Sequence, residues 1–189
     1  ICNRYENLVR NKKVDQAGRN LVAWRERRVF QPPATPATSG KNRPTVGVNR
    51  SYLTRSYCPL FSTFFAELGC EVVLPDRVDP RGVDQQASAF CFPGELAHGF
   101  MADLLSKKTD FLFLPHMRTL PADAPNDNAF ACVLVQSEPY YLRSCFSEIE
   151  GRGKGLLSPV LDFREGLAAA EPTFASMARQ IGRSRAEGR

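Results

Sequence analysis

The sequence predicts an α/β fold, in which a doubly wound, mainly parallel sheet of at least four strands lies between two layers of helices with a flavodoxin-like strand order. Short apolar runs such as Phe-Leu-Phe-Leu and Val-Leu-Val are typical of strands that are covered on both faces. These runs alternate with helical patterns, as in chains built from βαβ units. At 189 residues, with 43% hydrophobic content, the chain is long enough for one sizeable core.

The first βαβ unit is the clearest part of the pattern. Residues 44–49 read as a first strand and residues 70–75 as a second, with a helix between them that Gly69 ends. Crossover connections of this kind are right-handed and join parallel strands, so we expect the two strands to be parallel neighbours. The apolar face of the helix is formed by Leu60, Phe61, Phe64, Phe65 and Leu68.

The alternation continues through the middle of the chain. A helix or turn over residues 82–89 is followed by a helix across residues 90–107. A third strand is expected at residues 110–115 and a fourth at about residues 131–136. We expect the strand order second-first-third-fourth, with a switch point between the first and third strands. Ligands gather at the carboxyl ends of such strands, where four loops should share one rim: residues 49–55, 75–79, 115–118 and 136–140.

The last part of the chain is expected to be helical. One helix is predicted over residues 140–149, and the glycines of residues 151–155 break it. Ser158 is expected to cap a final helix that reaches toward Ile181 and is interrupted or restarted at Pro172.

Three segments are expected in the chain as a whole. Residues 1–42 form a basic amino-terminal segment, with a helix over residues 20–29 and a proline-rich linker. Residues 43–166 form the α/β domain, and residues 167–189 form a carboxyl-terminal helix and a polar tail. Because the first residue is not methionine, we expect the sequence to be a fragment of a longer protein.

Composition and missing motifs exclude several classes of function. Residues 1–55 carry 12 Lys and Arg against 3 Asp and Glu, but they lack the interleaved aromatic residues of a nucleic-acid surface. The apolar runs are far shorter than the roughly 20 residues that span a bilayer, so we do not expect a membrane protein. A P-loop is absent, so we expect no ATP site in this chain. The scattered cysteines, without Cys-x-x-Cys pairs, indicate cytosolic thiols and a cytoplasmic location.

Residues 90–101 carry the chemistry that the sequence points to. Cys91 directly precedes a predicted helix start that Pro93 marks, and a helix amino terminus favours thiolates and anions. Glu95 lies in the first turn, where it either complements the helix dipole or carries a proton for catalysis. Of the two histidines, His116 is the better catalytic candidate because it follows the third strand on the expected rim, whereas His98 fits a helix residue bonded to the backbone.

Several segments together resemble the uncharacterised domain of CoA-substrate-specific enzyme activases. The likeness covers roughly residues 1–166, and its blocks occur in the expected order. The blocks are residues 44–48, 64–69 (Phe-Phe-Ala-Glu-Leu-Gly), 72–74, 91–99 (Cys-Phe-Pro-x-x-Leu-Ala-His-Gly), 110–115, Cys132 with Gln136 and Pro139, and 158–164.

The resemblance implies a redox role. That domain is similar to 2-hydroxyacyl-CoA dehydratase subunits, in which cysteines on α/β lobes hold a four-iron four-sulfur cluster that passes an electron to an acyl-CoA. Cys91 and Cys132 match two of the family cysteines. The third family position is occupied by Tyr5, and Cys2, three residues earlier, is the substitute ligand. The implied partners are an ATPase activase module or a dehydratase subunit, and acyl-CoA.

The departure at Tyr5 leaves two functions open. The first is an iron–sulfur, dehydratase-like lobe that works in ATP-driven electron transfer for anaerobic acyl-CoA chemistry. The second is a non-catalytic α/β interaction domain of a larger activase protein that has lost the cluster. For the first, we expect the Cys91 and Cys132 sulfurs to reach one common site, and Cys70 and Cys145 to lie apart from it as core or helix residues.

Overall fold

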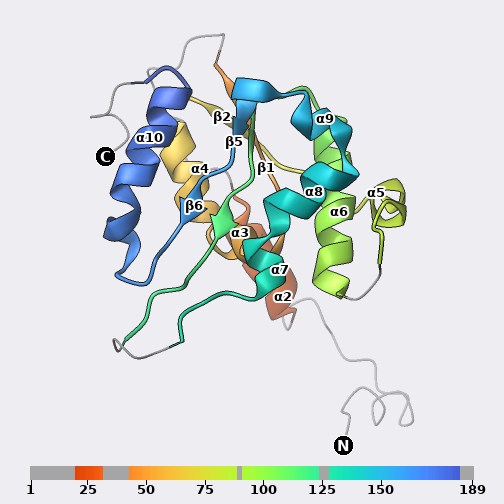
Figure 1. Cartoon of the computed structure of the whole chain (residues 1–189), viewed down its shortest axis with the longest axis horizontal. Helices are drawn as coiled ribbons and strands as arrows, with labels where there is room; N and C mark the ends of the chain where they lie inside the picture. Colours follow the sequence, from red (N-terminus) through yellow and green to blue (C-terminus); the bar gives the residue numbers. More distant parts are fainter. Residues whose placement is uncertain (1–19, 32–42, 89–90, 124–127, 184–189) are drawn as a thin grey trace, which may run out of the picture. The chain divides into compact units, whose positions relative to one another are not determined.

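The structure is a computed structural model, and it describes residues 20–31, 43–88, 91–123 and 128–183 (Figure 1). The chain divides into two compact units, Ile1–Gln31 and Pro32–Arg189. In the first unit, helix α2 (Leu21–Val29) confirms the helix predicted over residues 20–29. The Asn20 side chain caps it by accepting a 2.9 Å hydrogen bond from the Ala23 backbone N–H. The predicted linker lies mostly outside the described residues.

The second unit is built on a parallel sheet of four strands in the order β2-β1-β3-β5. The strands are β1 (Thr45–Val48), β2 (Glu71–Val73), β3 (Phe111–Phe113) and β5 (Leu156–Leu157). Val46 of β1 lies opposite Val72 on one side and Phe111 on the other. The predicted parallel sheet is confirmed, and so is the order of its first three strands.

The fourth strand is not where the sequence pattern placed it. Residues 133–136 form a single helical turn, α7 (Val133–Gln136), because the Cys132 carbonyl accepts hydrogen bonds from the Val135 and Gln136 N–H groups. The side chain of Val133 is 71% exposed, which a central strand would not allow. Strand β5 takes the place beside β3 instead, and β4 (His116–Met117) pairs with β6 (Val160–Leu161) in a separate two-stranded sheet.

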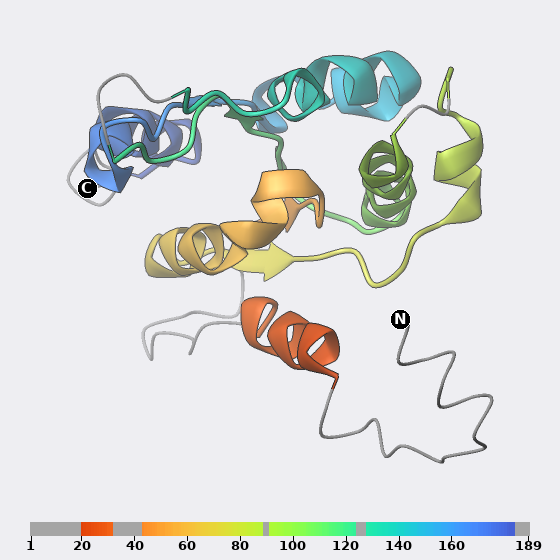
Figure 2. The same cartoon turned by 90° about the horizontal axis from the view of Figure 1, so that it is seen from below.

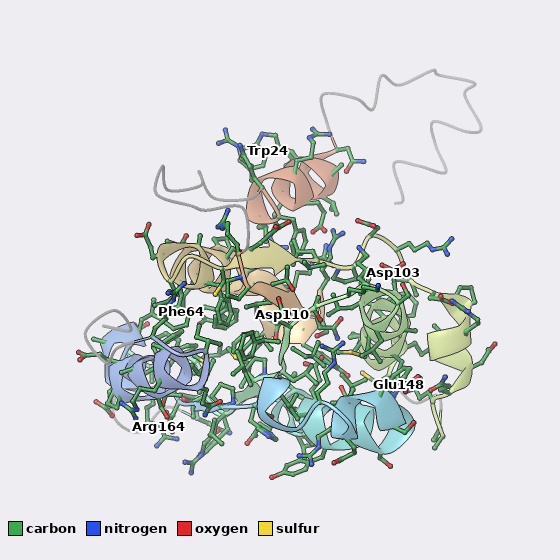
Figure 3. The ribbon with its side chains drawn as sticks, turned by 90° about the horizontal axis from the view of Figure 1, so that it is seen from above. Trp24, Phe64, Asp103, Asp110, Glu148 and Arg164 are labelled. Carbon is green, nitrogen blue, oxygen red and sulfur yellow. The ribbon has the colours of Figure 1, made fainter. Side chains whose placement is uncertain are left out.

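Helices cover both faces of the sheet, which gives the predicted three layers (Figure 2). Helices α4 (Cys58–Glu67) and α10 (Glu171–Gln180) pack on one face, where the Phe64 and Phe174 rings meet edge to face at 4.8 Å (Figure 3). Helices α6 (Phe92–Leu105), α8 (Glu138–Cys145) and α9 (Ser147–Glu150) pack on the other. Alternate residues of β3 separate the two cores, since Phe113 joins the first and Leu112 the second.

The remaining elements are short. They are α3 (Tyr52–Ser56), α5 (Pro80–Asp84), and the 3-10 turns η1 (Gly153–Gly155) and η2 (Leu167–Ala170). None of the helices in the described part of the chain is long and apolar enough to cross a membrane.

Two predicted helices differ from the structure. The helix expected over residues 140–149 is divided into α8 and α9 at Phe146, whose backbone is extended. The final helix does not start at Ser158, because the Ser158 hydroxyl donates to the Leu114 carbonyl at 2.9 Å and holds this segment against the end of β3. The helix begins instead at Glu171, with Pro172 in its first turn, as the restart at that proline predicted.

Helices α5 and α6 approach closely through two glycines. A Cβ added at Gly82 would lie 2.4 Å from the His98 carbonyl oxygen and 2.6 Å from the Ala102 Cβ. A Cβ at Gly99 would lie 2.3 Å from Val78 Cγ1. This contact holds the middle of α6 against α5 and the residues just before it.

We expect Gly82→Ala to lower the free energy of unfolding by about 1–3 kcal/mol, because the new methyl group meets backbone atoms that cannot move aside cheaply. Gly151→Ala is the matched control, since Gly151 has an ordinary φ of −64° and its nearest neighbour would be 3.7 Å away. Chemical denaturation of both variants measures the difference. Equal stability of the two variants would show that the α5–α6 contact is not tight.

Candidate functional site

The loops at the carboxyl ends of the central strands converge as predicted. Residues 49–50, which follow β1, bond to Pro75, which follows β2, and to Glu138 at the start of α8. His116, which follows β3, bonds to Gln136 at the end of α7. Three hydrogen bonds make these links: Arg50 Nη1 to the Pro75 carbonyl at 3.2 Å, Asn49 Nδ2 to Glu138 Oε1 at 3.2 Å, and His116 Nδ1 to the Gln136 carbonyl at 3.0 Å. These bonds bring the predicted segments together, but residues 136–140 belong to helices α7 and α8 and do not follow the predicted fourth strand.

A buried carboxyl group lies at the centre of this rim. Glu138, the first residue of α8, is 1% exposed, and its Oε1 accepts hydrogen bonds from the Ser51 hydroxyl and from Asn49 Nδ2. Asn49 Nδ2 also donates to the Ala97 carbonyl of α6 at 3.2 Å. The group therefore ties the end of β1 to α6 and α8. Its second oxygen, Oε2, is buried and has no hydrogen-bond partner among the described residues.

Burial raises the pKa of Glu138 to about 7, while the hydrogen bonds from Ser51 and Asn49 oppose the shift. A large fraction of this carboxyl is therefore protonated near neutral pH. Nothing in the sequence distinguishes Glu138 from an ordinary acidic residue in the first turn of a helix. Only the tertiary packing of the rim buries it.

A pocket of about 190 Å³ opens beside this network. It lies between the start of α3, the segment after α5, the first turns of α6, and helices α7 and α8. Among the described residues of its lining there is no Lys, Arg, Asp or Glu. The lining residues are Tyr52, Gln86, Ala87, Ser88, Cys91, Gly94, His98, Leu134, Tyr141, Ser144 and Cys145.

Gly94 lets the polar groups of the pocket come together. A Cβ at Gly94 would lie 2.9 Å from the Tyr52 hydroxyl oxygen and 3.4 Å from Gln86 Nε2. Tyr52 itself has a φ of 37°, which is the only positive φ of a non-glycine residue in the described part of the chain. Such backbone strain of about 1–3 kcal/mol is concentrated at functional sites in proteins.

The two tyrosines of the pocket are hard to ionise. Burial raises the pKa of Tyr52 to about 12, and nearby Cys91 and Glu138 add to this. Burial also raises the pKa of Tyr141, whose ring stacks on His98 with centroids 5.3 Å apart. The Tyr52 and Tyr141 hydroxyls are close enough to affect each other's ionisation, but their geometry is not that of a hydrogen bond. The buried Tyr141 hydroxyl thus has no bond partner among the described residues.

Of the cysteines proposed to bind metal, one lies on the pocket. Cys91 is the N-cap residue of α6 and is half-exposed, which agrees with the predicted helix start. Cys132 is exposed and directly precedes α7. It is not part of the pocket lining, although Leu134 is. Cys2 lies outside the described residues, and a shared site for Cys91 and Cys132 stays a prediction.

Cys145 is the last residue of α8 and lines the same pocket as Cys91. Cys70 is buried in the core, as expected. Burial raises the pKa of the Cys58, Cys70 and Cys145 thiols, which disfavours their thiolates. Within the part of the chain that the structure describes, no three or more His, Cys, Asp and Glu side chains are grouped so that they could hold a metal ion.

The two proposed catalytic residues lie outside the pocket lining. Glu95 is half-buried in the first turn of α6, and its backbone N–H donates to the Cys91 carbonyl at 3.1 Å. His116 is half-buried on the rim, with its ring 4.7 Å from that of Tyr140. His98 is buried, and its Nδ1 lies 2.8 Å from the Gly94 carbonyl, as expected for a helix histidine bonded to the backbone.

The raised pKa of Glu138 predicts a pH-dependent stability. The folded-state pKa of about 7 lies above the ordinary value of 4.5, so the contribution of Glu138 to stability is fully present below pH 4.5 and is lost as the pH rises to 7. The expected loss is about 3 kcal/mol. Glu138→Gln keeps the shape and should remove this fall, whereas Glu148→Gln, at an exposed acid, should keep it. Urea denaturation at a series of pH values tests this, and an unchanged pH profile in Glu138→Gln would contradict the assignment.

Comparison with known proteins identifies the family of this domain. Residues 45–189 match the family model described as the CoA enzyme activase uncharacterised domain, which is more than half of the chain. No curated protein and no solved structure is significantly similar to the sequence. The family block therefore covers every strand of the sheet, the buried Glu138 and the pocket beside Cys91, and the chain belongs to the family of CoA enzyme activase uncharacterised domains.

Proposed function

We propose that this domain is an iron–sulfur, dehydratase-like lobe of a CoA enzyme activase system, working in ATP-driven electron transfer. The observation that carries the proposal is the position of Cys91. Its thiol stands at the start of a 14-residue helix, on a pocket at the carboxyl end of a parallel sheet. Unpaired backbone N–H groups at such a helix start stabilise anionic sulfur. An ATPase activase module or a dehydratase subunit would be the partner.

The described thiols fit part of a cluster's ligand set. Cys91 and Cys132 are the more accessible candidates, at the starts of helices α6 and α7, whereas Cys58 and Cys70 are buried. Thiolates are the ligands that iron–sulfur clusters require, and such a cluster would supply one-electron transfer to an acyl-CoA. The third ligand would be Cys2. Cys91 and Cys132 would hold the cluster through their thiolates.

Anaerobic reconstitution with iron and sulfide tests this function. We expect the chain to bind about four iron ions and to show broad visible absorbance. Cys91→Ser, Cys132→Ser and Cys2→Ser should each lower the iron content, while Cys145→Ser, on the same pocket as Cys91, should not. Colourless, iron-free protein after reconstitution would contradict the proposal and would favour a non-catalytic interaction domain. Loss of iron in Cys145→Ser alone would overturn the ligand assignment.

Glu95, in the first turn of α6, and His116, on the rim, are the proposed catalytic residues of this function. We expect Glu95→Gln to lower the free energy of unfolding by about 0.3–1 kcal/mol, because Glu95 complements the dipole at the start of α6. Denaturation of the chain measures this effect, and electron transfer in the assembled activase system is measured beside it. A folded Glu95→Gln protein of unchanged stability that loses electron transfer would contradict the dipole role and assign Glu95 to proton transfer.

A further inference from the structure

The pocket beside α6 leads from the surface into the domain. Ala87, Ser88 and Ser144 of its lining are exposed, whereas Gly94 and His98 are buried. The pocket has a volume of about 190 Å³. An apolar cavity of about 150 Å³ is large enough to hold one benzene molecule. A molecule the size of benzene or toluene therefore fits in this pocket.

The surface that such a molecule meets is almost entirely apolar. The Tyr141 hydroxyl and Gln86 Oε1 have almost no accessible surface, so they offer no hydrogen bond to a ligand in the pocket. The His98 Nδ1 is already engaged with the Gly94 carbonyl at 2.8 Å. A polar ligand would lose its hydrogen bonds to water on entering and would gain few in return, so an apolar ligand is favoured.

The lining also disfavours charged ligands. Among its described residues there is no Lys, Arg, Asp or Glu, so neither a carboxylate nor an ammonium group finds a counter-ion there. Glu138 lies close enough to the Tyr52 and Tyr141 hydroxyls to raise the pKa of both, and its ionised form would repel an anion in this part of the domain. The ligand is therefore expected to be uncharged.

Residues with rings and with sulfur are frequent in the lining. They are Tyr52, His98 and Tyr141 with rings, and Cys91 and Cys145 with thiols. Contacts of aromatic rings and of sulfur with an aromatic ligand are more favourable than the buried area alone provides. We propose that this pocket binds a small uncharged aromatic molecule of the size of benzene or toluene. This site goes beyond the electron-transfer role, because it needs neither iron nor an activase partner.

Titration of the full chain with toluene, without added iron and followed by protein NMR, tests the inference. We expect saturable shifts at the residues of α6, α7 and α8 that line the pocket. Methylcyclohexane has a similar size but no aromatic ring, so it should bind about two- to ten-fold more weakly. Benzoate keeps the ring but carries a charge, so it should not bind.

Two substitutions in the lining should weaken toluene binding. Leu134→Gln makes one wall polar and should weaken binding about five-fold or more, and Val133→Gln is its matched control at the neighbouring exposed position of α7. Ser144→Phe crowds the entrance with a ring of its own and should have a similar effect. Its control is Ser147→Phe, at an exposed position of α9 outside the lining.

Thermal unfolding of each variant is recorded with the titration. Because Ser144 is exposed, Ser144→Phe keeps the test decisive even if Leu134→Gln does not fold. Three results would each overturn the proposal: no saturable toluene binding, binding of methylcyclohexane or benzoate as tight as that of toluene, or folded pocket variants that weaken binding no more than their controls. Iron binding is not part of the readout, so failure of the iron–sulfur function would not produce these results.

Discussion

The buried hydrogen bonds of Glu138 hold together the segments that form the candidate site. Glu138 accepts from Ser51 and Asn49 just after β1, and Asn49 reaches on to the Ala97 carbonyl of α6. One carboxyl group thereby fixes the exit of the central strand, the helix that follows Cys91 and the start of α8. The walls of the pocket are these same elements, so its shape depends on a polar group that is costly to bury in ionised form.

This arrangement exchanges stability for polar groups that are buried beside the pocket. Tyr52 is held at a positive φ, Gly94 leaves room for its hydroxyl, and the Tyr141 hydroxyl and Glu138 Oε2 remain unpaired among the described residues. A domain selected for stability alone would replace such groups with apolar ones. Features of this kind persist where the surrounding fold over-determines them, and they cluster at binding and catalytic sites.

The parts of the fold that depend on short-range interactions could be predicted from the sequence. Gly69, with a φ of 74°, ends α4 as expected, and the Cys-Phe-Pro start places Cys91 at the N-cap of α6. The run of residues 133–135 is too short to reveal its period, so its apolar pattern fits a strand as well as the helical turn that it forms. The burial of Glu138 and the position of Cys145 on the pocket result from the packing of distant segments, so residue spacing in the sequence does not predict them.

The most direct test of this account is the ionisation of Glu138 itself. Carbon-13 NMR of labelled glutamate side chains, assigned with Glu138→Gln, follows the Cδ shift of this one carboxyl through a pH titration. The account predicts a midpoint near pH 7. A midpoint at the ordinary value of about 4.5 would contradict a buried, partly protonated Glu138.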